Sequence, residues 1–190
     1  MTIEKVAREE LQDILQLQYR AYASEARLLN NWNIPPLKQT LAEVEAEWDK
    51  GVLLKAVEDG KLLGSVRAWE MDGTVYVGKL MVEPEFQGRG IGTKLYTALE
   101  KILDLQGYHI LYALVTEENT ESIAFHEKFS YKKQAFFPDC GWKFGRWLGV
   151  FWMEKRLNSV EIPTSFPTSW RSIGQKGEKS TDILAILSLS

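Results

Sequence analysis

The sequence has very little cysteine, no excess of basic residues and no long apolar run. A single cysteine among 190 residues excludes an internal disulfide and a zinc site built on cysteines, and we expect no metal. Lys and Arg number 23 against 26 Asp and Glu, so the basic excess typical of nucleic-acid-binding proteins is missing. No apolar run approaches the roughly 18–20 residues of a membrane span, and no apolar secretory leader follows Met1. We therefore expect a cytoplasmic protein without nucleic-acid or membrane partners.

What the sequence does contain is the composition of a folded domain. Hydrophobic residues make up 45% of the chain and charged residues 26%. The length fits one domain, at roughly 100–200 residues per domain. After residue 157, Ser, Thr and Pro become frequent, which is typical of weakly structured segments. We expect one domain over residues 1–157 and a weakly structured tail over 158–190.

The first half of the chain changes from a helical to a strand pattern. The first fifty residues have the apolar period of helices, and Thr40 followed by Glu43 is a capping box that predicts a helix start. From residue 52 onward, short apolar runs are separated by Asp-Gly pairs, which favour tight hairpin turns. Gly78 interrupts the third run and indicates a bulge. These runs predict an antiparallel meander of strands over 52–57, 62–69 and 75–82.

Helical and strand patterns alternate in the second half. The predicted elements are a helix over about 93–105, a strand over 109–115, a short helix over 119–129 and strands over 132–136 and 148–153. The fold class is α/β in the broad sense (α+β mixed), with a mixed sheet and helices on both of its faces.

The connection between the third strand and the following helix is rich in glycine. It reads Gln87-Gly88-Arg89-Gly90-Ile91-Gly92-Thr93. Amides at a helix start lack intrahelical acceptors, and the helix dipole adds positive charge there, so such a turn binds phosphate. Arg89 can add a charge-assisted hydrogen bond. A P-loop would need Gly-Lys-Ser/Thr, and a dinucleotide fingerprint would need glycine in place of Thr93, so neither fits. A tight turn without a ligand is the structural alternative.

The pattern Gln-x-x-Gly-x-Gly, after a strand that ends Leu80-Met81-Val82, resembles the coenzyme A loop of the GNAT superfamily of N-acetyltransferases. The resemblance extends over residues 3–157. It implies a mixed, mostly antiparallel sheet that is splayed between its fourth and fifth strands, with acetyl-CoA as the acyl donor. It also implies that the amides from Gln87 to Thr93 hold the pyrophosphate and that the main chain of Leu80, Met81 and Val82 pairs with the pantetheine arm.

A second match lies farther along the chain, at Asn119-Thr-Glu-Ser-Ile-Ala-Phe-His126-Glu-Lys-Phe-Ser130-Tyr131. It resembles the family's Asn-x-x-Ala-x-x-Leu-Tyr-Glu-Lys-x-Gly-Phe helix, with Ser130 in the place of glycine. The resemblance implies that Asn119 hydrogen-bonds the pantetheine. His126 replaces the family's general-acid tyrosine and is implied to protonate the departing thiolate. Phe-His-Glu-Lys and the segment 140–149 are similar to the phosphinothricin and methionine-sulfone acetyltransferase branch.

The chain also departs from that branch. Val77 stands where the branch has a glutamate, and the arginines of its acceptor pocket have no clear counterpart beyond Arg67. Glu70, at the end of the preceding strand, could act as the base through water, with a solvated surface carboxylate as the alternative. Cys140 has no neighbouring base to activate its thiol, so we expect a packing or loop residue.

The activity implied by the resemblance is direct transfer of an acetyl group to the primary amine of a small molecule, such as the amino-acid analogues phosphinothricin or methionine sulfone. Two alternatives stay open. One is transfer to a protein N-terminus or lysine, and the other is a non-catalytic acyl-CoA-binding sensor. The sequence also leaves homodimer formation open.

Overall fold

The computed structural model describes residues 1–157 except 29, 72, 73 and 144. The predicted tail over 158–190 and the predicted Asp72-Gly73 turn lie outside the described residues. The described chain divides into two compact units, which comprise residues 1–106 and 107–157. No helix among the described residues is long and apolar enough to cross a membrane.

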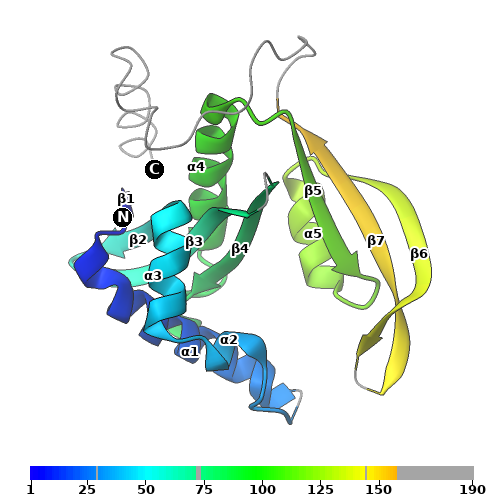
Figure 1. Cartoon of the computed structure of the whole chain (residues 1–190), viewed down its shortest axis with the longest axis horizontal. Coiled ribbons are helices and arrows are strands. Elements are labelled where there is room, and N and C mark those ends of the chain that lie inside the picture. The colour runs from blue at the N-terminus through cyan, green and yellow to red at the C-terminus, as the bar shows by residue number, and fades with distance from the viewer. Residues whose placement is uncertain (29, 72–73, 144, 158–190) are drawn as a thin grey trace. The chain divides into compact units, whose positions relative to one another are not determined.

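The first unit is built on a four-stranded antiparallel sheet (Figure 1). In spatial order its strands are β1 (Thr2–Lys5), β2 (Gly51–Glu58), β3 (Lys61–Met71) and β4 (Thr74–Val82). The predicted meander is confirmed in β2, β3 and β4. The prediction that the first fifty residues are helical is wrong at β1. The segment has one apolar residue, Ile3, which is also its only buried residue, so no apolar alternation marks it as a strand. Main-chain pairing with β2 determines the strand instead.

Helices flank this sheet on both faces. They are η1 (Arg8–Glu10), α1 (Leu11–Leu28), α2 (Pro35–Lys38), α3 (Leu41–Lys50), η2 (Pro84–Phe86) and α4 (Ile91–Gln106). The predicted capping box of α3 is confirmed, because the Glu43 N–H donates to Thr40 Oγ1 at 3.4 Å and the Thr40 N–H donates to the Glu43 carboxylate at 2.7 Å.

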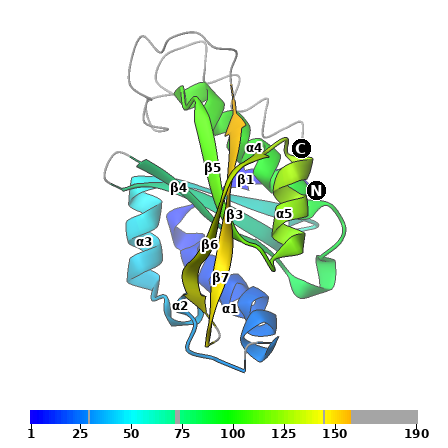
Figure 2. The ribbon, with the colours of Figure 1, turned by 90° about the vertical axis from the view of Figure 1, so that its right-hand side faces the viewer.

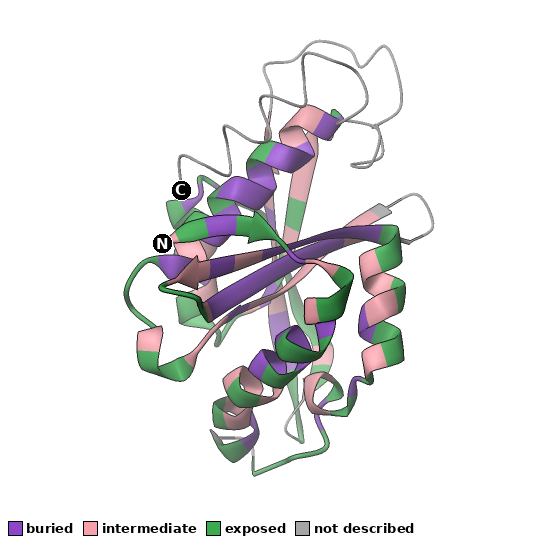
Figure 3. Cartoon of the chain, turned by 90° about the vertical axis from the view of Figure 1, so that its left-hand side faces the viewer, coloured by how far each residue is buried: buried purple, intermediate pink, exposed green. Residues whose placement is uncertain are grey.

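The core of the first unit lies on both faces of β2 and β3. Met81 of β4 belongs to an apolar cluster with Ile14 of α1 and Val44 of α3, whereas its neighbour Leu80 lies against Gly92 at the start of α4. Successive strand side chains point to opposite faces, so α1 and α3 cover one face and α4 covers the other. The inner strands are consequently buried over most of their length (Figure 3).

β4 contains the predicted bulge. Between the pairs Met81–Ser65 and Gly78–Arg67, β4 uses one residue more than β3. Lys79 lies in this stretch with a left-handed φ of 51°. The sequence predicted the bulge at Gly78, and the structure has the irregular residue one position later. The bulge matters because it redirects the Lys79 side chain.

The second unit has three strands and one helix. β5 (Ile110–Thr116), β7 (Arg146–Arg156) and β6 (Lys132–Lys143) form an antiparallel sheet in that spatial order. Figure 2 shows α5 (Thr120–Lys128) on one side of the three strands. β6 and β7 are longer than the predicted runs over 132–136 and 148–153. A bulge between Phe137 and Gly141, where Asp139 has φ 49°, interrupts the alternation of side chains along β6. For this reason the sequence did not predict the second half of the strand.

The single mixed sheet expected from the sequence is present as two hydrogen-bonded sheets. Strand pairing stops at β4 and resumes within the group β5, β7 and β6, and all pairs among the described strands are antiparallel. The interruption falls between the fourth and fifth strands, where the resemblance predicts the splay.

Candidate active site

The glycine turn ahead of α4 has the backbone of an anion site. Gly88 and Gly90 have φ of 77° and 79°, and a Cβ added to either would meet nothing within 4 Å. These positions need glycine for their left-handed backbone rather than for lack of space. The first helical bond runs from the Lys94 N–H to the Gly90 carbonyl at 3.1 Å. The N–H groups of Ile91 and Gly92 therefore lie in the first turn, where a helix offers them no acceptor.

Polar side chains border the same turn. Arg89 is 56% exposed, lies 3.9 Å from Glu58 and has its guanidinium 5.3 Å from the centre of the Phe86 ring. Gln87 donates from Nε2 to the Val82 carbonyl at 3.4 Å, which ties the turn to the end of β4. Since exposed ion pairs hold weakly, Arg89 can turn toward an anion at small cost.

β4 is an edge strand of its sheet. It pairs with β3, and no other strand pairs with it among the described residues. The outer edge of such a strand presents main-chain donors and acceptors that an extended ligand can match. Leu80, Met81 and Val82 occupy this strand between the bulge and the glycine turn. The predicted pantetheine segment is therefore followed, after the short helix η2, by the predicted pyrophosphate turn.

α5 holds His126 in a fixed orientation. His126 Nδ1 lies 2.7 Å from the Ser122 carbonyl, one helical turn earlier, and the ring packs edge-on against Phe125 and Tyr131. At the helix end, the Tyr131 N–H donates to the His126 carbonyl at 3.0 Å. Ser130 has a left-handed φ of 68°, the conformation for which the related sequences use glycine.

The Ser122 contact determines which nitrogen of His126 carries the proton. A carbonyl oxygen only accepts, so Nδ1 is the donor. In the neutral ring Nε2 then has the lone pair and is a proton acceptor. His126 can act as a general acid, the role implied by the resemblance, only as the imidazolium. The geometry thus allows one imidazole to take up a proton at Nε2 and later release it.

Asn119 caps the same helix. Its side-chain oxygen accepts from the Ser122 N–H at 3.0 Å, as an N-cap residue does. This bond commits the oxygen and leaves the NH₂ group as the donor that Asn119 can offer a pantetheine carbonyl.

The remaining predicted residues lie elsewhere. Glu70 is exposed and pairs with Val75 near the far end of β4, about 10 Å along the strand from Gly78 at about 3.3 Å per residue. Cys140 is exposed in the β6 bulge, consistent with a loop residue. The described residues contain no cluster of His, Cys, Asp and Glu that could hold a metal ion.

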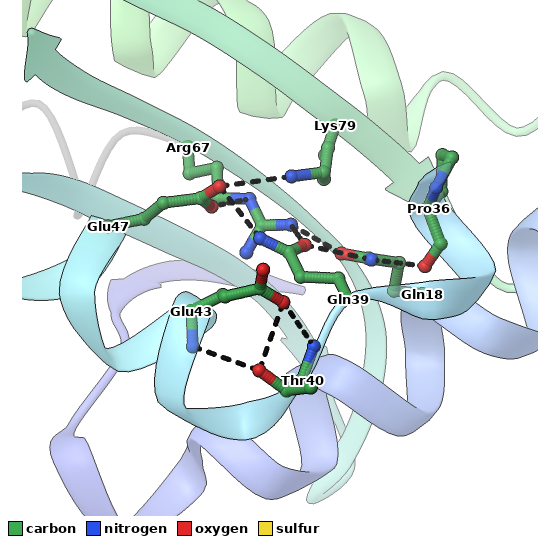
Figure 4. Close-up of polar contacts among 8 residues, drawn as sticks. All are labelled: Gln18, Pro36, Gln39, Thr40, Glu43, Glu47, Arg67 and Lys79. Carbon is green, nitrogen blue, oxygen red and sulfur yellow. Dashed lines mark hydrogen bonds and ion pairs between the residues drawn. The ribbon is translucent and has the colours of Figure 1, made fainter. Parts of the chain in front are cut away.

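Sequence reasoning missed a buried charged network in the first unit (Figure 4). Arg67 of β3 is completely buried, and its Nε lies 3.0 Å from the Glu47 carboxylate of α3. Its Nη2 donates to Gln18 and, at 2.9 Å, to Gln39. Lys79 in the β4 bulge donates to Glu47 at 3.2 Å. The available signal was a single charged residue, Arg67 or Lys79, inside each of the predicted runs 62–69 and 75–82.

The network also fixes the segment that joins α1 to α3. Gln18 donates to the Pro36 carbonyl at 2.6 Å, and the Tyr19 hydroxyl donates to the Gln39 carbonyl at 2.6 Å.

Burial lowers the pKa of Arg67, an effect that the Glu47 carboxylate opposes. Burial and the Arg67 charge lower the pKa of Lys79, again against Glu47.

Comparison with known proteins identifies the class. The chain matches the family described as Acetyltransferase (GNAT) family over residues 8–131, and it belongs to this family. Membership makes it an acetyl-CoA-dependent N-acyltransferase.

Individual proteins of known name are similar to this chain over different lengths. An L-methionine sulfoximine/L-methionine sulfone acetyltransferase of Salmonella typhimurium is 29% identical over 169 residues, which cover 86% of this chain and 98% of the relative. An N-acetyltransferase of Streptomyces griseus is 42% identical over 74 residues, 39% of this chain and 38% of the relative. A putative acetyltransferase of Salmonella typhimurium, solved with its cofactor acetyl-CoA, is 26% identical with a TM-score of 0.67 and covers 87% of this chain and 98% of its own.

Proposed function

We propose that this protein transfers the acetyl group of acetyl-CoA directly to the primary amine of a small molecule. The observation that carries the proposal is that an edge strand, a glycine turn and a helix start follow one another in the first unit. This arrangement offers main-chain partners for an extended arm and then amides for a diphosphate. Family membership supports the same assignment.

In this proposal the first unit binds the donor. The turn from Gln87 to Thr93 holds the pyrophosphate through its amides, with Arg89 as an exposed charged donor. The main chain of Leu80, Met81 and Val82 pairs with the pantetheine arm. Amides near the β4 bulge would then lie close to the thioester and could stabilise its oxygen as the tetrahedral intermediate forms.

The proposal also assigns the roles that the resemblance implies for two residues of the second unit. The Asn119 NH₂ donates to the pantetheine. His126 Nε2 accepts a proton as the amine attacks, and the imidazolium protonates the thiolate as the carbon–sulfur bond breaks. A thiol with a pKa of about 8.5 is a tolerable leaving group, so a modest acid suffices. Such acid–base help is worth roughly 10²–10⁴-fold in rate.

Glu70 stays the sequence-based prediction for a base. Glu70 is exposed near the end of β4, so it would act through water, whereas the ring of His126 is held in place by its bond to the Ser122 carbonyl. We therefore assign the principal proton transfer to His126 and the secondary role to Glu70.

Amino-acid analogues are the first acceptors to test. Relatives of this chain are named for L-methionine sulfoximine, L-methionine sulfone and phosphinothricin. A panel of these compounds, together with a polyamine, an aminoglycoside and a peptide with a free N-terminus, distinguishes small amino acids from the alternative acceptors.

The deciding experiment measures thiol release from acetyl-CoA with this panel and, separately, coenzyme A binding by calorimetry. Turnover with a small amine supports the proposal. Turnover with the peptide alone would support a protein acetyltransferase. Binding without thiol release from any amine would support a sensor, and absence of binding would refute the assigned donor site.

A further inference from the structure

We propose that Lys79, with the buried Arg67 guanidinium behind it, binds an anionic group of the acceptor, so that preferred acceptors have a carboxylate near the reacting amine. This inference rests on the proposed function, since it concerns the acceptor of the same reaction. It assigns recognition to Lys79, which neither the sequence motifs nor the relatives point to, and it gives Arg67, the sequence-based candidate for an acceptor-pocket arginine, a supporting role from the adjacent strand.

The first argument is the balance of buried charge. Arg67 is fully buried, the Lys79 side chain is 19% exposed, and both face the one carboxylate of Glu47, which is 16% exposed. Glu43 also interacts electrostatically with Lys79, but it is solvent-exposed and is bound by Thr40 in the capping box. The buried part of the cluster therefore has two cations for one carboxylate, an arrangement that favours an additional anion.

The second argument is the count of donors. Arg67 Nη1 is buried and has no hydrogen-bond acceptor among the described residues. Lys79 has three N–H donors, and the contact with Glu47 uses one of them. That same Glu47 oxygen also accepts from Gln39 at 2.7 Å, so it is shared. A buried donor without a partner is destabilising, and an anion bound at Lys79 would offset part of the excess positive charge around it.

The third argument is position. Lys79 is the left-handed residue of the bulge, directly before the Leu80–Val82 segment that is proposed to pair with the pantetheine. Because the arm would run from the glycine turn back along β4, its thioester end would lie near the bulge. Lys79 is also the more exposed of the two cations, so it is the one that an acceptor can reach, whereas Arg67 contributes charge from behind.

An aromatic surface lies beside the Lys79 ammonium. Nζ lies 5.4 Å from the centre of the Trp69 ring, which stacks on Tyr76 with centroids 6.1 Å apart. Gly78 permits this arrangement, because a Cβ there would lie 3.2 Å from the Trp69 ring. An acceptor with an anionic group and an apolar side chain would match the cation and the rings together.

The test compares two acceptors that share the same amine and side chain. They are an α-amino acid that the wild-type enzyme acetylates and its carboxamide, which lacks the negative charge. Wild type, Lys79→Met and Lys79→Arg are assayed with both at saturating acetyl-CoA. Lys55→Met is the matched control, because Lys55 is also a largely buried lysine bound to carboxylates, those of Glu4 and Glu10, on β2 of the same sheet.

We expect wild type to favour the amino acid. Lys79→Met should lower kcat/KM for the amino acid at least tenfold, mainly through KM, and leave the carboxamide within about twofold. Lys79→Arg should restore most of the difference, and Lys55→Met should change neither acceptor. A wild type indifferent to the carboxylate, or an equal loss with both acceptors, would overturn the inference while the transferase function stands. If wild type releases no thiol with any amine, the proposed function itself fails.

Discussion

The helices α4 and α5 begin in opposite ways. Before α5, the Asn119 side chain accepts a first-turn amide at 3.0 Å. Before α4 stands Gly90, which has no side chain to accept one, although its carbonyl takes the first helical bond. The first start is closed by the chain itself, and the second leaves amides of Ile91 and Gly92 for a ligand. The comparison shows that the same helix geometry serves as a structural cap in one place and as a candidate anion site in another.

The largest expected effect comes from blocking the open helix start. Gly90→Glu places a carboxylate where the proposal puts a diphosphate. Like charges in contact cost several kcal/mol, so the Kd for coenzyme A should rise at least about 100-fold, measured by calorimetry. Gly60→Glu is the control, since Gly60 also has a left-handed φ of 75° and open surroundings, in the β2–β3 turn. Equal affinity in the two variants would place the diphosphate elsewhere.

The next largest effect is expected at His126, whose ring α5 holds in a fixed orientation. His126→Phe keeps a ring against Phe125 and Tyr131 but removes Nε2. We expect kcat to fall about 100-fold, within the usual range for acid–base groups, with the KM for acetyl-CoA nearly unchanged. His109→Phe, the same change at the other histidine, should leave kcat as it is. A reduced affinity with normal kcat would contradict the assigned role.

Asn119→Asp separates capping from ligand binding at the closed helix start. The carboxylate still accepts from the Ser122 N–H, so stability should hold. The variant has no NH₂ group, however, and the affinity for coenzyme A should fall about tenfold, the equivalent of roughly 1.4 kcal/mol. Thermal unfolding and calorimetry on one preparation test both parts. Unchanged affinity would restrict Asn119 to its capping role.

The smallest effect is expected at α3, whose capped start has no proposed ligand. Thr40→Ala should cost about 1 kcal/mol of unfolding free energy and leave coenzyme A binding intact. The Thr40 N–H and hydroxyl also donate to the Glu43 carboxylate and lower the pKa of Glu43. The stability that comes from this lowered pKa is present above the ordinary carboxyl pKa and is lost as the pH falls through the lowered value. Urea unfolding at neutral and acidic pH tests this. Weaker coenzyme A binding by Thr40→Ala would contradict the distinction between helix starts that a side chain caps and the uncapped start of α4.

Local patterns predicted much of the fold and part of the site. The capping box at Thr40, the hairpin strands, the glycine turn and the Asn119 helix start all depend on residues a few positions apart, so their signals lie together in the sequence. β1 was missed because its pairing partner is β2, about fifty residues away. The bulge was predicted from Gly78, but its left-handed residue is Lys79, which no propensity favours there.

By itself, then, the sequence determined the turn that can hold a diphosphate and the helix that presents His126, because backbone preferences and hydrogen bonds within a few residues specify both. Only the tertiary structure decided that Arg67, Glu47 and Lys79 meet. They come from β3, α3 and β4, and their approach depends on strand register, on the bulge and on how α3 packs against the sheet. The structure likewise decided the proton position of His126, because the distance from Nδ1 to a carbonyl, and not the residue type, fixes the donor.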